Sequence, residues 1–335
     1  MIRAAICGFG ALGRSHADSL ARMDGVKVEA ICDIRMEQIQ AKDIAFNVQT
    51  DRRGIDVQAC RLYTDLRQML EAEKPDVVAT ALPTDVHAEA AVAAMEAGAH
   101  VFTEKPMALT VAQCDQMLEA SRRCGRQLMV AQCLRFWPEY EALVEIIRSG
   151  RYGRLQTLTL ERVGSYTTWS AGNWMNDHHR SGGAILDLHL HDVDWVWHAL
   201  GKPRRLCAAG LKGKTGGVDD VTAVWDYAGT VVTLRGSWMG SGFTMSFRAY
   251  FENASVEFGV HPDTALRVWH SGAAAAEKIP VAAESGYVRE MAYFIDCVRG
   301  RHANAVCPAE STRESVALVM KEAEAIEKGR WVEIE

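Results

Sequence analysis

The stretch "CGFGALGRSH", which follows the apolar run "IRAAI", constrains the fold of this chain most strongly. It places glycines in a G-x-G-x-x-G pattern between an expected strand and an expected helix. In a βαβ unit these glycines allow a tight turn, a close approach of the backbone to a pyrophosphate and close helix packing. The pattern predicts a dinucleotide-binding loop, and a plain strand–turn–helix is the alternative. The loop residues are Gly8, Phe9, Gly10, Ala11, Leu12 and Gly13.

The next expected strand, "VKVEAICD", ends at Asp33, which bears on the choice of cofactor. An acidic residue at this point hydrogen-bonds the ribose hydroxyls of NAD and repels the 2′-phosphate of NADP. We therefore expect Asp33, Ile34 and Arg35 to contact the cofactor and NAD to be preferred. Arg35 leaves NADP open, because arginine pairs with phosphate. Asp33 as the N-cap of the following helix is the alternative.

The pattern of elements changes along the chain. Strand-like and helix-like segments alternate up to about residue 132, as in a parallel sheet covered on both faces. From Leu155 onwards long alternating runs are separated by Gly, Asn and Asp, which indicates antiparallel hairpins. We predict an α/β chain with a doubly wound Rossmann domain over 1–125. An α+β domain with a large, mainly antiparallel open sheet follows over 126–335, for substrate binding and oligomerisation.

Composition narrows the class of protein. The 335 residues carry a formal net charge of −6 with both signs mixed, so nucleic acid and anionic membranes are not expected as partners. No apolar run approaches the length of a membrane span, and the N-terminus does not resemble a secretory signal. The nine cysteines are scattered without a CxxC pair. We expect reduced thiols in a cytoplasmic protein, without a structural metal.

Lys105 stands in "TEKP", directly after the apolar run "AHVF". Lysine is rarely buried unless it is paired, so a lysine at the end of a buried strand needs a reason. In open α/β sheets ligands bind beyond the carboxyl ends of the strands. Lys105 is therefore a candidate site residue, and a surface Lys–Glu pair on a loop is the alternative.

Three segments together resemble the Gfo/Idh/MocA oxidoreductases, in the same order and over essentially the whole chain. They are "GFGALGRSH", "ALPTDVHAEAAVAAMEAGAHVFTEKPMA" and "GGAILDLHLHDVDWVWHALG". The resemblance implies hydride transfer between a nicotinamide and a hydroxyl or keto carbon of a sugar, cyclitol or glycoside. It also implies a homodimer or homotetramer formed through the C-terminal sheet.

The resemblance assigns roles to residues of the first domain. It implies that Lys105 lies beside the nicotinamide and the reacting carbon, where an ammonium stabilises developing negative charge on oxygen. Pro106 is a candidate for a cis bond. The other residues implied at the cofactor are Leu82, Pro83, Thr84, His87, Glu104 and Gln132. For Thr84, with Asp85, helix capping is the alternative.

"LDLHLHDVDW" carries the D-x-x-x-H pattern of the resemblance in Asp187 and His191. One helix is expected over 183–201, and the i, i+4 spacing places both side chains on one of its faces. The resemblance implies that His191 is the general acid–base and that Asp187 binds substrate or orients the site. A satisfied, partly buried structural pair is the alternative. His189 is either structural or part of the substrate pocket. Histidines two apart on a helix do not converge on one ion, so no metal is expected.

Three further residues are candidates for substrate binding. Arg135 follows the last expected strand of the first domain, and Trp174 and Arg180 lie in the loop before the Asp–His segment. A tryptophan can stack on the C–H face of a sugar, and Trp169 is the alternative to Trp174. Two other functions stay open. One is a keto-sugar step in glycoside breakdown with a cofactor that stays bound, and the other is a non-catalytic dinucleotide-binding regulator.

Overall fold

The computed structural model describes residues 1–40 and 55–334, and these divide into two compact units. Unit 1 contains Met1–Cys133, Thr168–Trp174 and Ser285–Glu314. Unit 2 contains Leu134–Thr167, Met175–Glu284 and Ser315–Glu335. The chain thus returns to unit 1 twice after the first 133 residues.

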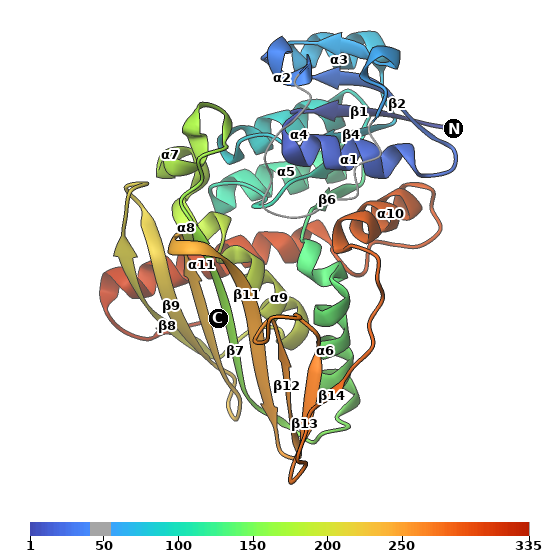
Figure 1. Ribbon diagram of the computed structural model, residues 1–335. Coiled ribbons are helices and arrows are strands. Elements are labelled where there is room, and N and C mark those ends of the chain that lie inside the picture. The colour runs from blue at the N-terminus through green and yellow to red at the C-terminus, as the bar shows by residue number, and fades with distance from the viewer. Residues whose placement is uncertain (41–54, 335) are drawn as a thin grey trace. The chain divides into compact units, whose positions relative to one another are not determined.

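Unit 1 is built on a six-stranded parallel sheet with the order β3-β2-β1-β4-β5-β6 (Figure 1). Its strands are β1 (Ile2–Cys7), β2 (Val26–Cys32), β3 (Arg61–Tyr63), β4 (Val77–Thr80), β5 (His100–Thr103) and β6 (Leu128–Val130). Its helices are α1 (Ala11–Ala21), α2 (Met36–Gln40), η1 (Val57–Ala59), α3 (Leu66–Glu73), η2 (Thr84–Val86), α4 (His87–Glu96), α5 (Val111–Cys124) and α10 (Gly286–Val298). The predicted doubly wound parallel sheet is confirmed.

Local sequence explains where these elements begin and end. The central strand β4 is buried throughout, as expected for a parallel strand covered on both faces. Thr110 and Gln113 form a reciprocal capping box at the start of α5, and Gly125 ends that helix in the left-handed conformation. By contrast the N-cap of α1 is Gly10, which provides no side-chain cap.

Unit 2 contains a nine-stranded sheet with the order β14-β13-β12-β11-β7-β10-β9-β8-β15. Only the β7–β10 pair is parallel among the described pairs, so the predicted mainly antiparallel sheet is confirmed. Its strands are β7 (Leu155–Ser165), β8 (Arg205–Lys212), β9 (Val218–Asp226), β10 (Val231–Ser237), β11 (Met239–Phe251), β12 (Ala254–Phe258), β13 (Arg267–His270), β14 (Glu277–Lys278) and β15 (Val332–Glu333).

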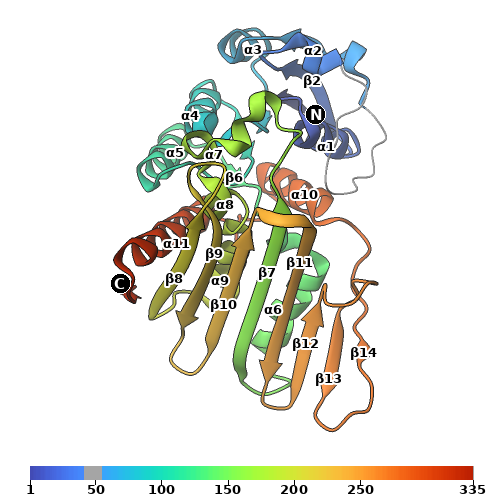
Figure 2. The ribbon, with the colours of Figure 1, turned by 60° about the vertical axis from the view of Figure 1, so that its left-hand side comes forward.

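Helices cover one face of this sheet (Figure 2). They are α6 (Pro138–Ser149), α8 (Gly183–Asp187), α9 (Leu190–Leu200) and the larger part of α11 (Ala309–Lys328). The short helix α7 (His178–Ser181) lies between α6 and α8 in the chain, whereas η3 (Cys133–Phe136) and η4 (Ala171–Asn176) straddle the division into units. An aromatic cluster joins helices to sheet: the ring of Tyr140 contacts Trp195, Phe247 and Phe258 edge to face.

The single helix expected over 183–201 is wrong, because α8 ends at Asp187 and α9 begins at Leu190. At the junction the His189 N–H donates to the Ala184 carbonyl, five residues back, instead of four. Such a wider turn changes which side chains share a face. In the described ranges no helix is long and apolar enough to cross a bilayer.

Candidate functional site

The glycine loop in unit 1 has the geometry of a phosphate-binding turn. A Cβ on Gly13 would overlap the Gly8 carbonyl oxygen, and a Cβ on Gly8, whose φ is +86°, would overlap that of Ala81. Gly10, the N-cap of α1, has no side chain, so the first backbone N–H groups of the helix receive no hydrogen bond from a capping side chain. A helix N-terminus of this kind favours an anion such as a pyrophosphate. The loop therefore fits a dinucleotide.

Asp33 follows β2 and supports the same loop. Its carboxylate accepts hydrogen bonds from the Phe9 N–H at 2.8 Å and from the Arg35 N–H at 3.0 Å. The bond to Arg35 is a local turn before α2 and not an N-cap of that helix, which begins at Met36, while the bond to Phe9 ties Asp33 to the glycine loop. Ile34 between them is 83% exposed, which is unusual for so large an apolar side chain. The sugar-binding role of Asp33 stays a prediction.

Among the buried polar atoms of unit 1 that have no partner in the described residues, two belong to residues that the sequence assigned to the cofactor. They are Oγ1 of Thr84 and Nε2 of Gln132. Neither η2 nor α4 has a side-chain cap in the described structure, so the capping alternative for Thr84 does not hold. Buried polar groups normally find a hydrogen-bond partner, so these atoms fit a polar ligand such as a nicotinamide nucleotide.

Glu104 and Lys105 follow β5 directly, at the carboxyl edge of the parallel sheet. Glu104 is only 5% exposed, and its Oε1 lies 2.7 Å from Nε2 of His16 on α1. Its Oε2 accepts from the Lys105 backbone N–H at 3.2 Å. Lys105 is half-buried, and the bond to Pro106 is cis. The fold thus fixes the backbone that carries Lys105, whereas the contact of Glu104 with a ribose stays a prediction.

Sequence reasoning missed two residues beside this segment. His16 lies on the buried side of α1 and makes the contact with Glu104. Glu290, on α10, is fully buried, and neither carboxyl oxygen has a partner among the described residues. Burial raises the pKa of Glu290 well above its usual range, and the charge of Glu104 raises it further. The helical spacing of His16 with Gly13 and Leu20 could have indicated that His16 lies on the buried side of α1. No local sequence pattern connects Glu290 with Glu104.

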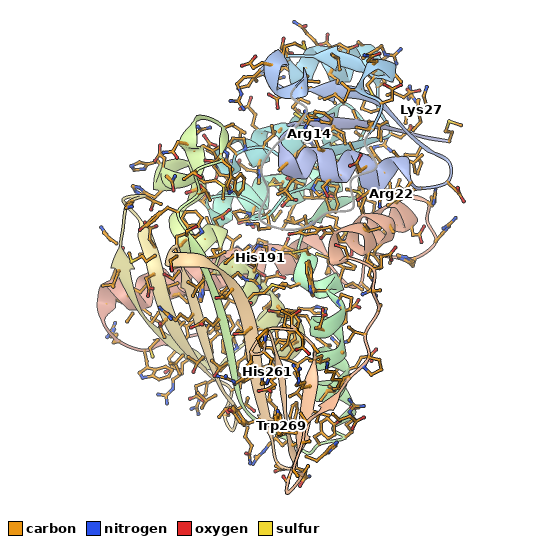
Figure 3. The ribbon with its side chains drawn as sticks, in the orientation of Figure 1. Arg14, Arg22, Lys27, His191, His261 and Trp269 are labelled. Carbon is orange, nitrogen blue, oxygen red and sulfur yellow. The ribbon has the colours of Figure 1, made fainter. Side chains whose placement is uncertain are left out.

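Asp187 and His191 lie on either side of the wider turn in unit 2. Asp187 is the last residue of α8 and is buried, while His191 is the second residue of α9 and is half-buried (Figure 3). They are therefore on two successive helices rather than on one face of a single helix. Their assignment to catalysis stays a prediction.

Three polar side chains anchor the start of α9. The His189 ring bonds Glu322 of α11 at 2.9 Å, and Glu322 also accepts from the Trp225 indole at 2.8 Å. Asp192 receives two hydrogen bonds from Arg162 of β7, both at 3.0 Å. All of these groups are buried. Of the two roles left open for His189, the structure supports the structural one.

Asp194 forms the third anchor, and its partner is Arg135. Nε and Nη2 of Arg135 donate to this carboxylate at 2.8 and 2.7 Å, and the Ser315 hydroxyl adds a bond of 2.6 Å. Arg135 is 2% exposed. The guanidinium of Arg135 is therefore already paired with a carboxylate inside unit 2. Binding of substrate by Arg135 stays a prediction that its environment does not support.

The remaining substrate candidates lie in the segment before α8. Trp174 is half-buried at the end of a stretch assigned to unit 1, and Arg180 is half-buried on α7 of unit 2. Neither assignment is tested by these positions. Over residues 1–40 and 55–334, no three His, Cys, Asp or Glu side chains gather as a metal ion would require.

The sequence matches two profiles of one protein family. Residues 2–132 match the profile described as an oxidoreductase family with an NAD-binding Rossmann fold. Residues 140–257 match the GFO/IDH/MocA C-terminal domain.

Curated relatives match part of the chain. D-glucoside 3-dehydrogenase of Escherichia coli is 30% identical over 203 residues, which are 60% of this chain and 55% of that protein. Myo-inositol 2-dehydrogenase of Thermotoga maritima is 27% identical over 202 residues, again 60% of this chain and 55% of that protein. The match thus spans about half the length of these relatives.

Solved structures match along the whole chain. The WlbA dehydrogenase from Bordetella pertussis, in complex with NADH and UDP-GlcNAcA, superposes with a TM-score of 0.83. The alignment covers 100% of this chain and 99% of that one, with 21% identity. At this identity the likeness shows the fold.

Proposed function

The chain belongs to the Gfo/Idh/MocA oxidoreductases and begins with an NAD-binding Rossmann domain, and on this premise we propose that it is a sugar or polyol dehydrogenase. It oxidises a hydroxyl carbon of a sugar, cyclitol or glycoside, or reduces the matching keto carbon. One observation carries the proposal. A half-buried lysine follows β5 at the carboxyl edge of the same sheet whose glycine loop fits a dinucleotide.

NAD rather than NADP is the proposed cofactor, and when bound it accepts the hydride. Gly8–Gly13 and the first amides of α1 hold the pyrophosphate, and Asp33 binds the adenosine ribose. The buried polar atoms of Thr84 and Gln132 supply hydrogen bonds to the nicotinamide half. A carboxylate already fixed by two backbone N–H groups cannot turn away from a 2′-phosphate, which supports the preference for NAD.

The reaction needs a group that removes the hydroxyl proton and a group that stabilises the charge on oxygen. We assign the first task to His191, since imidazole exchanges protons near neutral pH. Lys105 has the second task, because its ammonium attracts the oxygen more strongly as negative charge develops. Asp187 orients His191 or the substrate. These roles require Lys105 and His191 to act on one substrate, which a double-mutant cycle tests.

Two broader assignments belong to the same proposal. The nine cysteines are all free thiols in the structure, which supports a reducing, cytoplasmic location. Association into a dimer or tetramer through the sheet of unit 2 rests on the family resemblance.

The first test is formation of NADH, followed by its near-ultraviolet absorbance. NAD is offered with a panel of inositols, aldoses, sugar acids and glycosides, and the Lys105→Ala variant serves as the matched control. We expect a signal with one group of substrates that is lost in the variant. A flat response from protein that already carries nucleotide would favour the keto-sugar step with a bound cofactor. A flat response from nucleotide-free protein that still binds NADH would favour the regulator.

A further inference from the structure

His87 makes an unusual pair of contacts inside unit 1. Its Nδ1 lies 2.8 Å from the Pro106 carbonyl oxygen, and its Nε2 lies 2.8 Å from the Leu82 carbonyl oxygen. The side chain is 1% exposed, so water does not compete for either nitrogen. One ring therefore joins the loop after β4 to the segment after β5, which lies beside β4 in the sheet.

Both partners of the His87 ring are hydrogen-bond acceptors. A carbonyl oxygen only accepts hydrogen bonds, so each contact needs an N–H from the ring. A neutral imidazole has one N–H and holds one carbonyl at a time, whereas the protonated ring holds both. Burial lowers the pKa of His87 and Lys105 acts in the same direction, while the two carbonyls and Glu104 oppose them. The protonated ring is therefore the form that joins both segments, and the neutral ring holds one of them at a time.

The two carbonyls belong to the segments on which the proposed function depends. Leu82 precedes Pro83 and Thr84, which are assigned to the cofactor, and Pro106 follows Lys105. We propose that His87 is a positioning residue that cross-links these segments and so sets Lys105 against the cofactor-binding loop. The role of the cross-link in turnover rests on the proposed function, whereas the cross-link itself does not.

The position of His87 in the sequence explains how the ring reaches both segments. It is the first residue of α4, directly after η2, so the sheet and the helix fix its backbone. The contact to Leu82 is local, and the contact to Pro106 spans 19 residues. Glu104 is held separately by His16, so the segment 104–106 is tied at both ends by buried histidines.

Two substitutions separate the two ends of the ring. His87→Asn keeps an amide nitrogen where Nδ1 lies, and His87→Gln keeps one near the place of Nε2. The asparagine can still donate to Pro106 and the glutamine to Leu82. Each variant therefore serves as the matched control for the other.

The decisive readout is amide hydrogen exchange, measured by mass spectrometry without nucleotide or substrate. We expect His87→Gln to speed exchange in 103–109 by about threefold to tenfold, the effect of one lost hydrogen bond, and to leave 81–86 unchanged. His87→Asn should show the reverse pattern, with peptides from α5 as the reference. Equal effects of both variants on both segments, or no effect, would overturn the cross-link.

NADH titration and turnover then test the catalytic role. We expect His87→Gln to keep NADH affinity and lose kcat by about tenfold or more, and His87→Asn to weaken NADH binding with a smaller loss of kcat. Equal losses in both variants would overturn positioning while the dehydrogenase assignment stands. If the unaltered protein neither binds NADH nor turns over any substrate, the proposed function fails, and the exchange pattern still decides the cross-link.

Discussion

At the scale of single residues, Lys105 carries the most specific prediction. Replacing it by alanine should lower kcat by about 10²–10³-fold, since the charge on oxygen loses its stabilising ammonium. NADH affinity should stay within a few-fold, because the glycine loop and Asp33 are unchanged. Lys27→Ala is the control: this lysine is exposed on β2 of the same unit (Figure 3), next to Glu29. Full turnover in Lys105→Ala would remove the lysine from the mechanism.

His191 should govern the pH dependence of turnover. A base must be neutral to accept the hydroxyl proton, so kcat for oxidation should fall on the acid side as the imidazole is protonated. His191→Asn should lower kcat and flatten this acid limb in a pH–rate profile. The same change at His261, which bonds Glu257 on β12, should leave the profile intact. A flattened limb in both variants, or in neither, would assign the proton transfer to another group.

The sequence predicted candidate site residues, such as Lys105 and His191, only where they belong to a recognisable motif. The glycine loop, Asp33 and Lys105 stand next to the strands that position them. His16 and Glu290 were missed, because both interact with Glu104 from far away in the sequence. His16 contacts Glu104 across 88 residues, and the charge of Glu104 acts on the carboxyl group of Glu290. Arg135 looked available for a ligand, yet its carboxylate partner Asp194 lies 59 residues further along the chain.

At the scale of elements, the packing of α10 makes stability depend on pH. Because the folded state raises the pKa of Glu290, the folded protein holds a proton there that the unfolded chain releases above its ordinary pKa. The free energy of unfolding should therefore fall as pH rises from about 4.5, by about 1.4 kcal/mol for each unit by which the pKa is raised. Glu290→Gln, which is always neutral, should raise Tm at pH 8 more than at pH 5.

Thermal unfolding of both variants at several pH values checks this expectation. Glu119→Gln, on the exposed face of α5, is the matched substitution and should change Tm little at either pH. A Tm gain for Glu290→Gln that is equal at both pH values would mean that the carboxyl group is not the source of the pH dependence.

At the break between α8 and α9, the helical periodicity of the apolar residues gave a wrong prediction. The apolar spacing over 183–201 is helical throughout, which favoured one helix. The chain instead widens its turn at His189, whose ring is held by Glu322 of α11, 133 residues away. This tertiary hydrogen bond between buried groups holds the His189 ring at the junction, and no local pattern encodes it.

At the scale of the whole molecule, the outer face of the large sheet bears on association. Its exposed positions include the polar Thr157, Thr159 and Arg248, and beside them the apolar Val231 and Tyr250, which are 44% and 48% exposed. Arg235 and Glu161 form an ion pair there at 3.0 Å. If copies of the chain associate through this face, the interface mixes apolar, polar and charged side chains.

Sedimentation measures the association directly. We expect a dimer or tetramer, which Thr157→Glu shifts toward monomer by placing a charge between Val231 and Tyr250 in the interface. Gln116→Glu, on the exposed surface of α5, is the control. An oligomer that persists in Thr157→Glu would place the contact elsewhere.

Much of the architecture followed from pattern alone. Alternating strands and helices predicted the parallel sheet, and long alternating runs predicted the antiparallel one. The strands β3, β8, β13, β14 and β15 were not predicted, although β8 has eight residues. The short strands β4, β5 and β6 were predicted from continuous apolar runs between helical segments. The return of 285–314 to unit 1 was also missed, since α10 packs on α1 through side chains far apart in sequence.

The most direct test of the central claim follows the transferred hydrogen. The best substrate of the panel is prepared with deuterium on its carbinol carbon. After the reaction the protein is denatured, and the mass of the released nucleotide is measured by mass spectrometry. We expect one deuterium in the recovered NADH, with transfer strongly slowed in Lys105→Ala. NADH without deuterium, or an oxidised nucleotide that stays unreduced on a protein that binds it, would contradict the assignment as a dehydrogenase.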